Sequence, residues 1–177
     1  MDLPSYAGVI TFLFTDIEGS SRLWEEHPEQ MRHALACHDA IARSTVEGNR
    51  GTVVKRTGDG LLAAFRDAGD AVAAAIELQS ALADSRSTAG LSLTVRCGMH
   101  AGVTEVRDGD FFGNPVNRAA RIMSAAHGGQ VLASQVVAEL TCNHLAPGVS
   151  LILQRICNPR FNLAASRSRQ DLHTEPR

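Results

Sequence analysis

The sequence has few of the residues that hold a disulfide-bonded or zinc-bound scaffold together. Its four cysteines, Cys37, Cys97, Cys142 and Cys157, are far apart and form no CxxC pair, so a Cys/His zinc site is not expected. None of the seven histidines belongs to an HExxH pattern. Unpaired thiols in a chain of 177 residues favour a reducing compartment over a disulfide framework.

Long apolar runs and an excess of positive charge are also missing. The apolar run at 9–14 is too short to span a bilayer or to form the core of a signal peptide, so we expect a cytoplasmic protein without a membrane partner. With 17 basic and 19 acidic residues, the net charge of −2 argues against a nucleic-acid partner held by bulk charge. The hydrophobic content of 44% and the length are typical of one globular domain with its own core.

The pattern of apolar and turn residues predicts an α+β fold, a ferredoxin-like βααββαβ sandwich with helices packed against one face of a mostly antiparallel sheet. The run from Val9 to Thr15 lacks polar alternation, which is typical of a central strand buried on both faces. The turn 58–60 joins two short strands into a hairpin. The other expected elements are helices at 20–24, 28–46, 67–83, 115–126 and 134–140 and strands at 52–57, 61–65, 91–99 and 131–132.

The chain divides into two parts by composition. Residues 1–150 carry the periodic segments and are expected to form the domain. Residues 151–177 include a short apolar stretch at 151–156 that is compatible with a strand, but from Asn158 onward they are polar and rich in Arg and Ser. We expect this atypical C-terminal segment to be partly disordered.

Two acidic turns stand out as candidate metal ligands. Asp16 follows the buried strand, and Asp59 lies at the tip of the hairpin. If the two strands lie side by side, both carboxylates meet at one end of the sheet, where they suit Mg²⁺, a hard cation that takes few protein oxygens and keeps positions for water and phosphate. The alternative is that each Asp only shapes its turn, where Asp is common.

Two further patterns suit an anionic substrate. Gly19, Ser20 and Ser21 open a helix, whose first backbone N–H groups can bind phosphate, although the segment is not a P-loop and an ordinary capped helix start is the simpler interpretation. Asn117 and Arg121 lie four residues apart and so share one face of a helix. An amide and a guanidinium together suit an anionic transition state, while the alternative is a solvated polar face.

Taken together, three segments resemble the class III adenylyl/guanylyl cyclase catalytic domain of bacterial adenylyl type, over about Gly8 to Val149. They are FLFTDIEGS at 12–20, KRTGDG at 55–60 and GDFFGNPVNRAAR at 109–121. Their order and spacing match the family as well. A diguanylate cyclase is disfavoured because the sequence has no GG[DE]EF turn.

The resemblance implies a metal site. Asp16, Asp59 and the backbone carbonyl of Ile17 would hold two Mg²⁺ or Mn²⁺ ions. One ion would activate the ribose 3′-hydroxyl of ATP, and the other would bind the triphosphate and help pyrophosphate to leave. The backbone of residues 17–21 would cradle the phosphates.

The resemblance also implies the substrate. Lys55 and Asp110 would recognise the base, because adenine presents an acceptor at N1 and a donor at N6, whereas guanine presents the opposite pattern. Asn117 would orient the ribose, and Arg121 would stabilise the charge that builds on the α-phosphate. The expected activity is that of an adenylate cyclase, which converts ATP to 3′,5′-cyclic AMP and pyrophosphate.

In this family each site lies across a head-to-tail dimer, and the chain carries both halves, so a C2 homodimer would have two complete sites. The chain departs from the family's pattern in two places. Val103 stands where many relatives have an arginine, and residues 151–177 do not resemble the hairpin that completes the sheet of relatives. The rival hypothesis is therefore a catalytically weak or silent cyclase-fold module for nucleotide binding or dimerisation.

Overall fold

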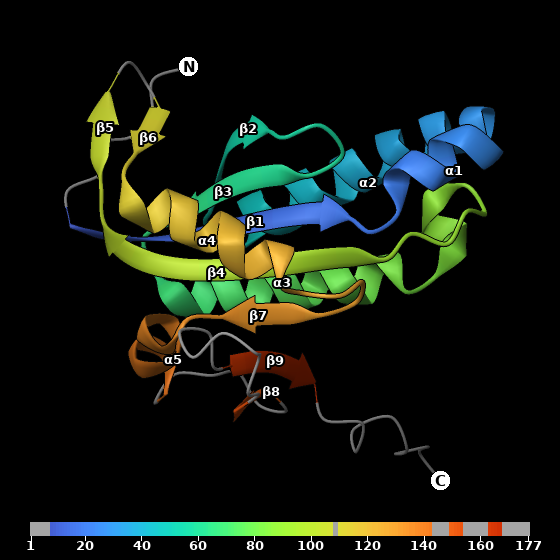
Figure 1. The fold of residues 1–177 in the computed structure, drawn as a ribbon. Coiled ribbons are helices and arrows are strands. Elements are labelled where there is room, and N and C mark those ends of the chain that lie inside the picture. The colour runs from blue at the N-terminus through green and yellow to red at the C-terminus, as the bar shows by residue number, and fades with distance from the viewer. Residues whose placement is uncertain (1–7, 108–109, 143–148, 154–162, 168–177) are drawn as a thin grey trace, which may run out of the picture.

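The computed structural model describes residues 8–107, 110–142, 149–153 and 163–167 (Figure 1). Its helices and strands are, in chain order, β1 (Val9–Ile17), α1 (Ser20–Glu26), α2 (Pro28–Gly48), β2 (Thr52–Arg56), β3 (Leu61–Phe65), α3 (Ala68–Leu82), the 3₁₀ helix η1 (Ser85–Thr88), β4 (Val95–Val103), β5 (Glu105–Arg107), β6 (Asp110–Phe112), α4 (Asn114–Ser124), β7 (Val131–Ala133), α5 (Gln135–Thr141), β8 (Val149–Leu153) and β9 (Leu163–Arg167).

The strands form a seven-stranded sheet in the order β2-β3-β1-β4-β7-β9-β8, with β5 and β6 as a separate two-stranded hairpin. The pair β4–β7 is parallel, and the other neighbouring strands of the large sheet pair antiparallel. The expected βααββαβ order and the mostly antiparallel α+β sheet are confirmed. In this order β1 and β4 lie at the centre, so the segment that ends at Asp16 is held by a strand on each side.

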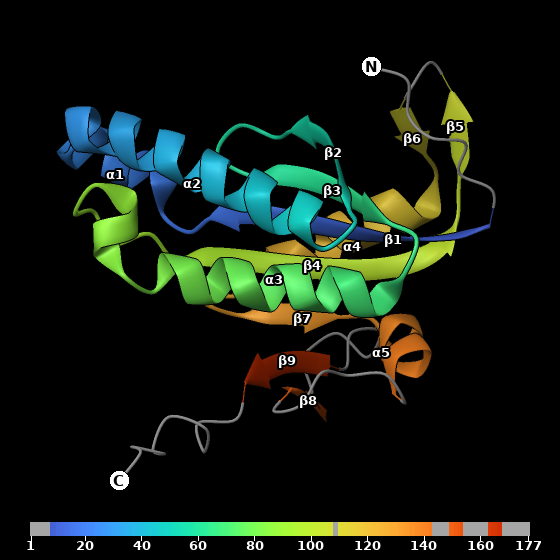
Figure 2. The same ribbon diagram turned by 180° about the vertical axis from the view of Figure 1, so that it is seen from behind.

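Strand β1 is buried on both faces, as its apolar run predicts. Leu13 and Ile17 belong to the core that α2 and α3 cover, whereas Phe12 and Phe14 belong to a second core that includes the apolar face of α4. The prediction that helices cover one face of the sheet is wrong: α2 and α3 lie on one face and α4 on the other (Figures 1 and 2). The physical reason is that an apolar strand without alternation needs a covering layer on each side.

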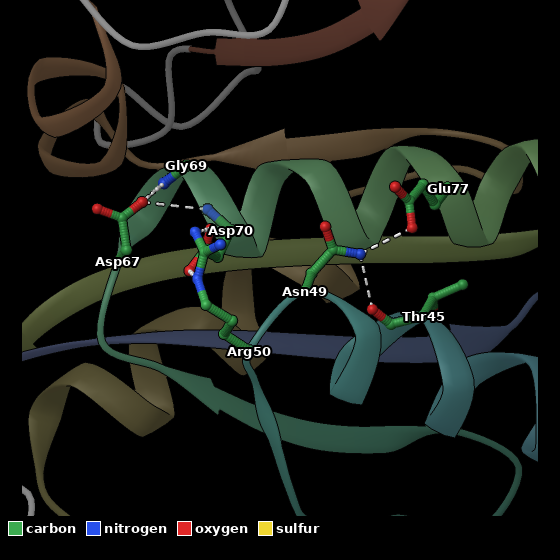
Figure 3. A network of polar contacts seen from close by, with 7 residues as sticks. All are labelled: Thr45, Asn49, Arg50, Asp67, Gly69, Asp70 and Glu77. Carbon is green, nitrogen blue, oxygen red and sulfur yellow. Dashed lines mark hydrogen bonds and ion pairs between the residues drawn. The ribbon is translucent and has the colours of Figure 1, made fainter.

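The C-terminal end of α2 is tied to α3 by side chains shown in Figure 3. The amide nitrogen of Asn49 donates to the Thr45 carbonyl at 2.8 Å and to the Glu77 carboxylate at 2.7 Å. Arg50 follows and forms an ion pair with Asp70 through its Nε and Nη2 atoms. These contacts fix the point at which the chain leaves α2 and enters the β2–β3 hairpin.

The β2–β3 hairpin ends in the tight turn that carries Asp59. The Thr57 N–H donates to the Gly60 carbonyl at 3.0 Å, and Gly58 has a positive φ of 81°, a conformation that favours glycine. Strand β2 contains a register shift between Val53 and Lys55. Within the described residues β2 has a neighbouring strand on one side only, so it is an edge of the sheet.

The strand expected at 91–99 begins later, at Val95, and continues to Val103. The residues before it belong to a turn instead: the Leu91 N–H donates to the Thr88 carbonyl at 3.1 Å, and Gly90 has a positive φ of 85°. The Leu91 N–H therefore forms a hydrogen bond within the turn and not with a neighbouring strand.

The C-terminal segment contains more regular structure than its composition indicates. Strand β9 pairs with β7 and with β8, so the expectation that 151–177 lacks a hairpin completing the sheet is wrong for this part of the backbone. Partial disorder was expected over 151–177; residues 163–167 of that range form strand β9, whereas 154–162 and 168–177 lie outside the described residues, so for them the expectation stays a prediction. The domain boundary at 150 stays a prediction.

The sequence predicted free cysteines and no membrane-spanning segment. Cys37, Cys97 and Cys142 are free thiols, as expected, and Cys157 lies outside the described residues. Among the helices that the structure describes, none is long and apolar enough to cross a membrane.

Candidate active site

The two acidic turns predicted to hold metal are adjacent in the fold. A Cβ atom added to Gly60 would lie 1.9 Å from the Thr15 carbonyl oxygen and 3.0 Å from the Asp16 Cα, so the hairpin turn rests directly on the end of β1. The contact is fixed by a hydrogen bond, in which the Leu61 N–H donates to the Thr15 hydroxyl at 3.1 Å. The structure therefore brings the backbone of Asp59 and that of Asp16 to the same end of the sheet.

The Asp16 carboxylate is held by an arginine that the sequence reasoning missed. Asp16 pairs in register with Arg96 of β4, and Arg96 donates to Oδ2 from Nε at 2.7 Å and from Nη2 at 2.5 Å. Both side chains are partly exposed, 21% for Asp16 and 33% for Arg96. A charged residue between the apolar Val95 and Cys97 was the available signal, but its partner depends on a strand register that the sequence does not reveal.

Asp59 has an unsatisfied carboxylate oxygen. Its Oδ2 atom is buried and, within the described residues, has no hydrogen-bond partner. Buried polar atoms nearly always have a partner, so an unpaired carboxylate oxygen here is suited to a bound cation or water. Within the described residues, no group of three or more His, Cys, Asp or Glu could hold a metal ion. Two carboxylates with few further protein ligands fit Mg²⁺, which retains water and phosphate oxygens.

A buried histidine on α2 interacts electrostatically with Asp59. Burial lowers the pKa of His38 to about 4, with the Asp59 charge opposing this shift and the Arg56 guanidinium adding to it. His38 Nδ1 lies 3.2 Å from an oxygen of Asp39, which also pairs with Arg56. Because a carboxylate only accepts, Nδ1 of the neutral ring is the donor, and the buried, unpartnered Nε2 carries the lone pair.

The residues predicted to bind phosphate lie at the start of α1. Ile17 is buried as the last residue of β1, and the Glu18 N–H donates to the Thr94 carbonyl at 2.9 Å. Gly19 is the N-cap of α1 with a φ of 69°, and Ser20 and Ser21 are its first two residues. The roles of Ile17 as a metal ligand and of Gly19, Ser20 and Ser21 in phosphate binding stay predictions.

Of the two residues predicted to recognise the base, the structure describes the side chain of Lys55 but only the backbone of Asp110. Lys55 is exposed on β2, in register with Leu62 of β3. Asp110 is the first residue of β6, in register with Arg107 of β5, and its side chain lies outside the described part of the chain. Recognition of adenine by Lys55 and Asp110 stays a prediction.

Asn117 and Arg121 share the outer face of α4, as their spacing predicts. Val116, Ala119 and Ile122 form the buried face of the helix, whereas Asn117 and Arg121 are exposed and, within the described residues, their side chains make no hydrogen bond or ion pair. The helix packs closely on the sheet: a Cβ atom added to Gly98 of β4 would lie 2.1 Å from a backbone nitrogen of α4. The structure thus presents the amide and the guanidinium outward, away from the chain's own core.

The family follows from the match of residues 4–147 to the adenylate and guanylate cyclase catalytic domain. The chain belongs to this family. The cyclase domain occupies most of the chain, and the motifs that carry Asp16, Asp59, Asn117 and Arg121 all lie inside it.

Relatives of this cyclase domain include enzymes and proteins without an assigned activity. The chain is 34% identical over 147 residues to an uncharacterised protein of Mycobacterium tuberculosis, covering 82% of this chain and 49% of that protein. It is 34% identical over 155 residues to the adenylate cyclase of Schizosaccharomyces pombe, covering 73% of this chain and 9% of that enzyme. The chain therefore spans about half the length of the mycobacterial relative and a small part of the fission yeast enzyme.

A solved structure confirms the fold of the cyclase domain. The structure of adenylate cyclases from Trypanosoma brucei in their monomeric state superposes with a TM-score of 0.75 at 25% identity, covering 93% of this chain and 91% of that one. The observed α+β architecture is that of a cyclase catalytic domain.

Proposed function

We propose that the chain is an adenylate cyclase, which converts ATP to 3′,5′-cyclic AMP and pyrophosphate at sites shared between two chains. The main support for the proposal is that the predicted site residues form two separate groups within one chain. Asp16 and Asp59 lie together at the end of β1, while Asn117 and Arg121 point outward from α4 without partners among the described residues.

Asp16 and Asp59 are the proposed metal ligands, with the Ile17 carbonyl as a third. The contact of Gly60 with the end of β1 and the buried, unpaired Oδ2 of Asp59 support this assignment. Two Mg²⁺ or Mn²⁺ ions bound there would supply activation of the ribose 3′-hydroxyl and neutralisation of the triphosphate charge. The protein's own contribution is to hold two carboxylates in fixed positions before the ions arrive, so that little reorganisation is needed.

Arg121 is proposed to stabilise the negative charge that builds on the α-phosphate, and Asn117 to orient the ribose. Their exposure on α4 supports a role toward a ligand or partner rather than toward the chain's own core. A guanidinium offers several N–H donors in a fixed plane and so matches phosphate oxygens well. In a head-to-tail homodimer with twofold symmetry, α4 of one chain would face the carboxylates of the other, which gives two equivalent sites.

ATP is the proposed substrate because Lys55 and Asp110 complement adenine. The ammonium donates to the N1 acceptor of adenine, and the carboxylate accepts from its N6 amino group. With guanine the same two groups would be left unpaired, which is costly in a desolvated site. The relation to adenylate cyclases of fungi supports this choice, although the family as a whole includes enzymes for both nucleotides.

The test is a complementation assay. Asp59→Ala and Arg121→Ala chains are each incubated with Mn²⁺ and ATP, alone and mixed, and cyclic AMP is measured, with GTP in parallel reactions. Each variant alone is expected to be inactive, and the mixture to recover about a quarter of wild-type activity, because random pairing yields one intact site in half of the dimers.

Three results would contradict this proposal in different ways. No recovery in the mixture would refute the shared site. Cyclic GMP in place of cyclic AMP would refute the base assignment. No cyclic product from the wild-type chain at high concentration would favour the silent nucleotide-binding or dimerisation module. The exposed Val103, which stands where many relatives carry an arginine, is the observation that favours that module.

A further inference from the structure

A cavity of about 300 Å³ lies between α2 and the β2–β3 hairpin. Its wall is formed by Asp39, Ala40 and Arg43 of α2, Val53 and Arg56 of β2, and Leu61 of β3. The side chains of Arg43 and Arg56 are 55% exposed, whereas Leu61 is buried, so the cavity extends from the surface to the core. Helix α2 covers this side of the sheet, and α4 lies on the other side (Figures 1 and 2). A ligand in the cavity would therefore leave Asn117 and Arg121 of α4 accessible.

The charged residues of the cavity wall favour an anion. Asp39 already has two partners: Oδ1 lies 3.2 Å from Nδ1 of the buried His38, and Oδ2 pairs with Arg56. Arg43 pairs at 3.3 Å with Glu47, which is not part of the wall. Each of these arginine contacts uses one terminal nitrogen of a guanidinium that has five N–H donors. Two guanidinium groups and one carboxylate give the wall a net positive charge.

The inner part of the wall is apolar, which limits the kind of anion. Leu61 is 4% exposed and belongs to the core, and the partly buried Val53 packs against the same core. At about 30 Å³ for each water-sized unit, the cavity has room for about ten non-hydrogen atoms. Each CH₂ group that leaves water here would tighten binding about fourfold. The best match is a molecule with one carboxylate and a short apolar chain.

We propose that this cavity binds a small monocarboxylic acid with an apolar chain. Its carboxylate would accept hydrogen bonds from Arg43 and Arg56, and its chain would lie against Val53 and Leu61. The bound acid would then link α2 to both strands of the hairpin. Arg56 and Leu61 lie on either side of the turn that carries Asp59, so the acid would hold this turn in place and raise cyclase activity. Only the effect on activity rests on the proposed function.

The first test is isothermal titration calorimetry of the intact chain with sodium octanoate, without metal or nucleotide. Octanoate should bind with a Kd of about 1 mM or lower, and affinity should rise about tenfold from butanoate to hexanoate and again to octanoate. Decanoate should gain little, because the cavity is then full. 1-Octanol and octylamine, which lack the negative charge, should bind at least about tenfold more weakly than octanoate.

Two variants place the binding in this cavity. Arg43→Gln removes one guanidinium and should weaken octanoate binding at least about tenfold. Val53→Phe fills the cavity and should abolish binding, and an aromatic residue is compatible with its partly exposed strand. The matched control is Arg32→Gln, which removes an exposed arginine of the same helix and its 3.0 Å pair with Glu29. This control should bind octanoate as the wild type does, and circular dichroism confirms that each variant is folded.

Four results would overturn the binding site. They are no octanoate binding by the wild type, equal affinity for 1-octanol, an affinity that keeps rising to decanoate, and undiminished binding by both Arg43→Gln and Val53→Phe. The first excludes a site, the second excludes recognition of the charge, the third indicates adsorption to an apolar surface, and the fourth places the ligand elsewhere.

Cyclic AMP formation with Mn²⁺ and ATP tests the effect on activity. Saturating octanoate should raise the rate of the wild type about twofold or more and leave the rate of Val53→Phe unchanged, because a turn held in place needs less reorganisation. Octanoate binding without any rise in the wild-type rate would refute the effector role. If the wild type forms no cyclic nucleotide at all, the proposed function fails and the effector role fails with it, whereas the calorimetry still decides whether the cavity binds the acid.

Discussion

Replacement of Gly60 by alanine tests whether the close contact between the β2–β3 turn and the end of β1 positions the two proposed metal ligands. The φ of Gly60 is not in the left-handed range, so its backbone conformation does not require glycine. Glycine is required because there is no room for a Cβ atom. The added Cβ would lie 1.9 Å from the Thr15 carbonyl oxygen and 3.0 Å from the Asp16 Cα, both backbone atoms that no side-chain rotation can move. The hairpin turn must therefore move away from β1 by about 1.5 Å to restore van der Waals distance.

The displacement has two measurable consequences. It weakens the hydrogen bond from the Leu61 N–H to Thr15 and strains a packed region, which together should lower the free energy of unfolding by about 2 to 4 kcal/mol. It also separates Asp59 from Asp16, and a misplacement of about 1 Å in a catalytic site typically costs around 10²-fold in rate. Gly60→Ala is expected to lose both Mn²⁺ binding and cyclic AMP formation.

The assays are urea denaturation, Mn²⁺ titration and cyclic AMP formation, all at a temperature where the variant is folded. The control is Gly48→Ala, at the end of α2, where an added Cβ meets nothing within 4 Å and alanine is the better helix former. That variant should be as active as the wild type and equally stable or slightly more so. A folded Gly60→Ala chain that retains more than half of the wild-type activity would refute the idea that this contact positions the carboxylates.

Three further changes test other parts of the structure. Gly98→Ala places a Cβ 2.1 Å from a backbone nitrogen of α4, so it should displace that helix and reduce cyclic AMP formation at least tenfold while Mn²⁺ titration stays unchanged; equal losses of both would contradict a separate role for α4. Thr15→Val leaves the buried hairpin N–H without its acceptor and should cost about 1–3 kcal/mol in urea denaturation, whereas Thr11→Val, in the same buried strand, should cost less than half as much. Burial lowers the pKa to about 4 both for His38 and for His100, a buried residue of β4 whose Nδ1 lies 2.8 Å from the Ser134 hydroxyl. Both histidines therefore stay neutral in the folded chain, while the unfolded chain takes up protons near pH 6.5. The free energy of unfolding should therefore be nearly constant above about pH 7 and fall between pH 6.5 and 4, by at most about 3 kcal/mol per histidine; His100→Asn should reduce that slope, and an unchanged slope would contradict the assignment.

Much of the fold could be predicted because its signals are local. The apolar run of β1, the turn glycines around Asp59 and the helical spacing of Asn117 and Arg121 are each read from a few neighbouring residues, and each is confirmed. The strand was predicted to begin at residue 91 but begins at Val95. The residues before Val95 have a strand-like composition, but hydrogen bonds within the preceding turn hold them in that turn. Local composition does not show which of two competing hydrogen-bond patterns is formed.

The parts that could not be predicted depend on contacts between distant segments. Arg96 meets Asp16 only because β1 and β4 pair in one particular register, and a shift of one residue would place Arg96 on the other face of the sheet. The burial of His38 and its interaction with Asp59 depend on how α2 packs against the hairpin. Likewise, β9 lies in the C-terminal segment that was expected to be partly disordered, and it pairs with β7, about thirty positions earlier in the chain.

Among the strands that the structure describes, β2 lies at the edge of the sheet, and this position has a consequence for protein engineering. An open strand edge is a template on which other chains can add, and proteins protect such edges with bulges and charged side chains. Here the register shift beside Val53 and the exposed Lys55 and Arg56 serve that purpose. A change of Lys55 to an uncharged residue, made to alter which nucleotide base is accepted, would therefore also remove a barrier to aggregation. Variants designed for a new base should keep a charge at the neighbouring position and be compared by light scattering before their activities are compared.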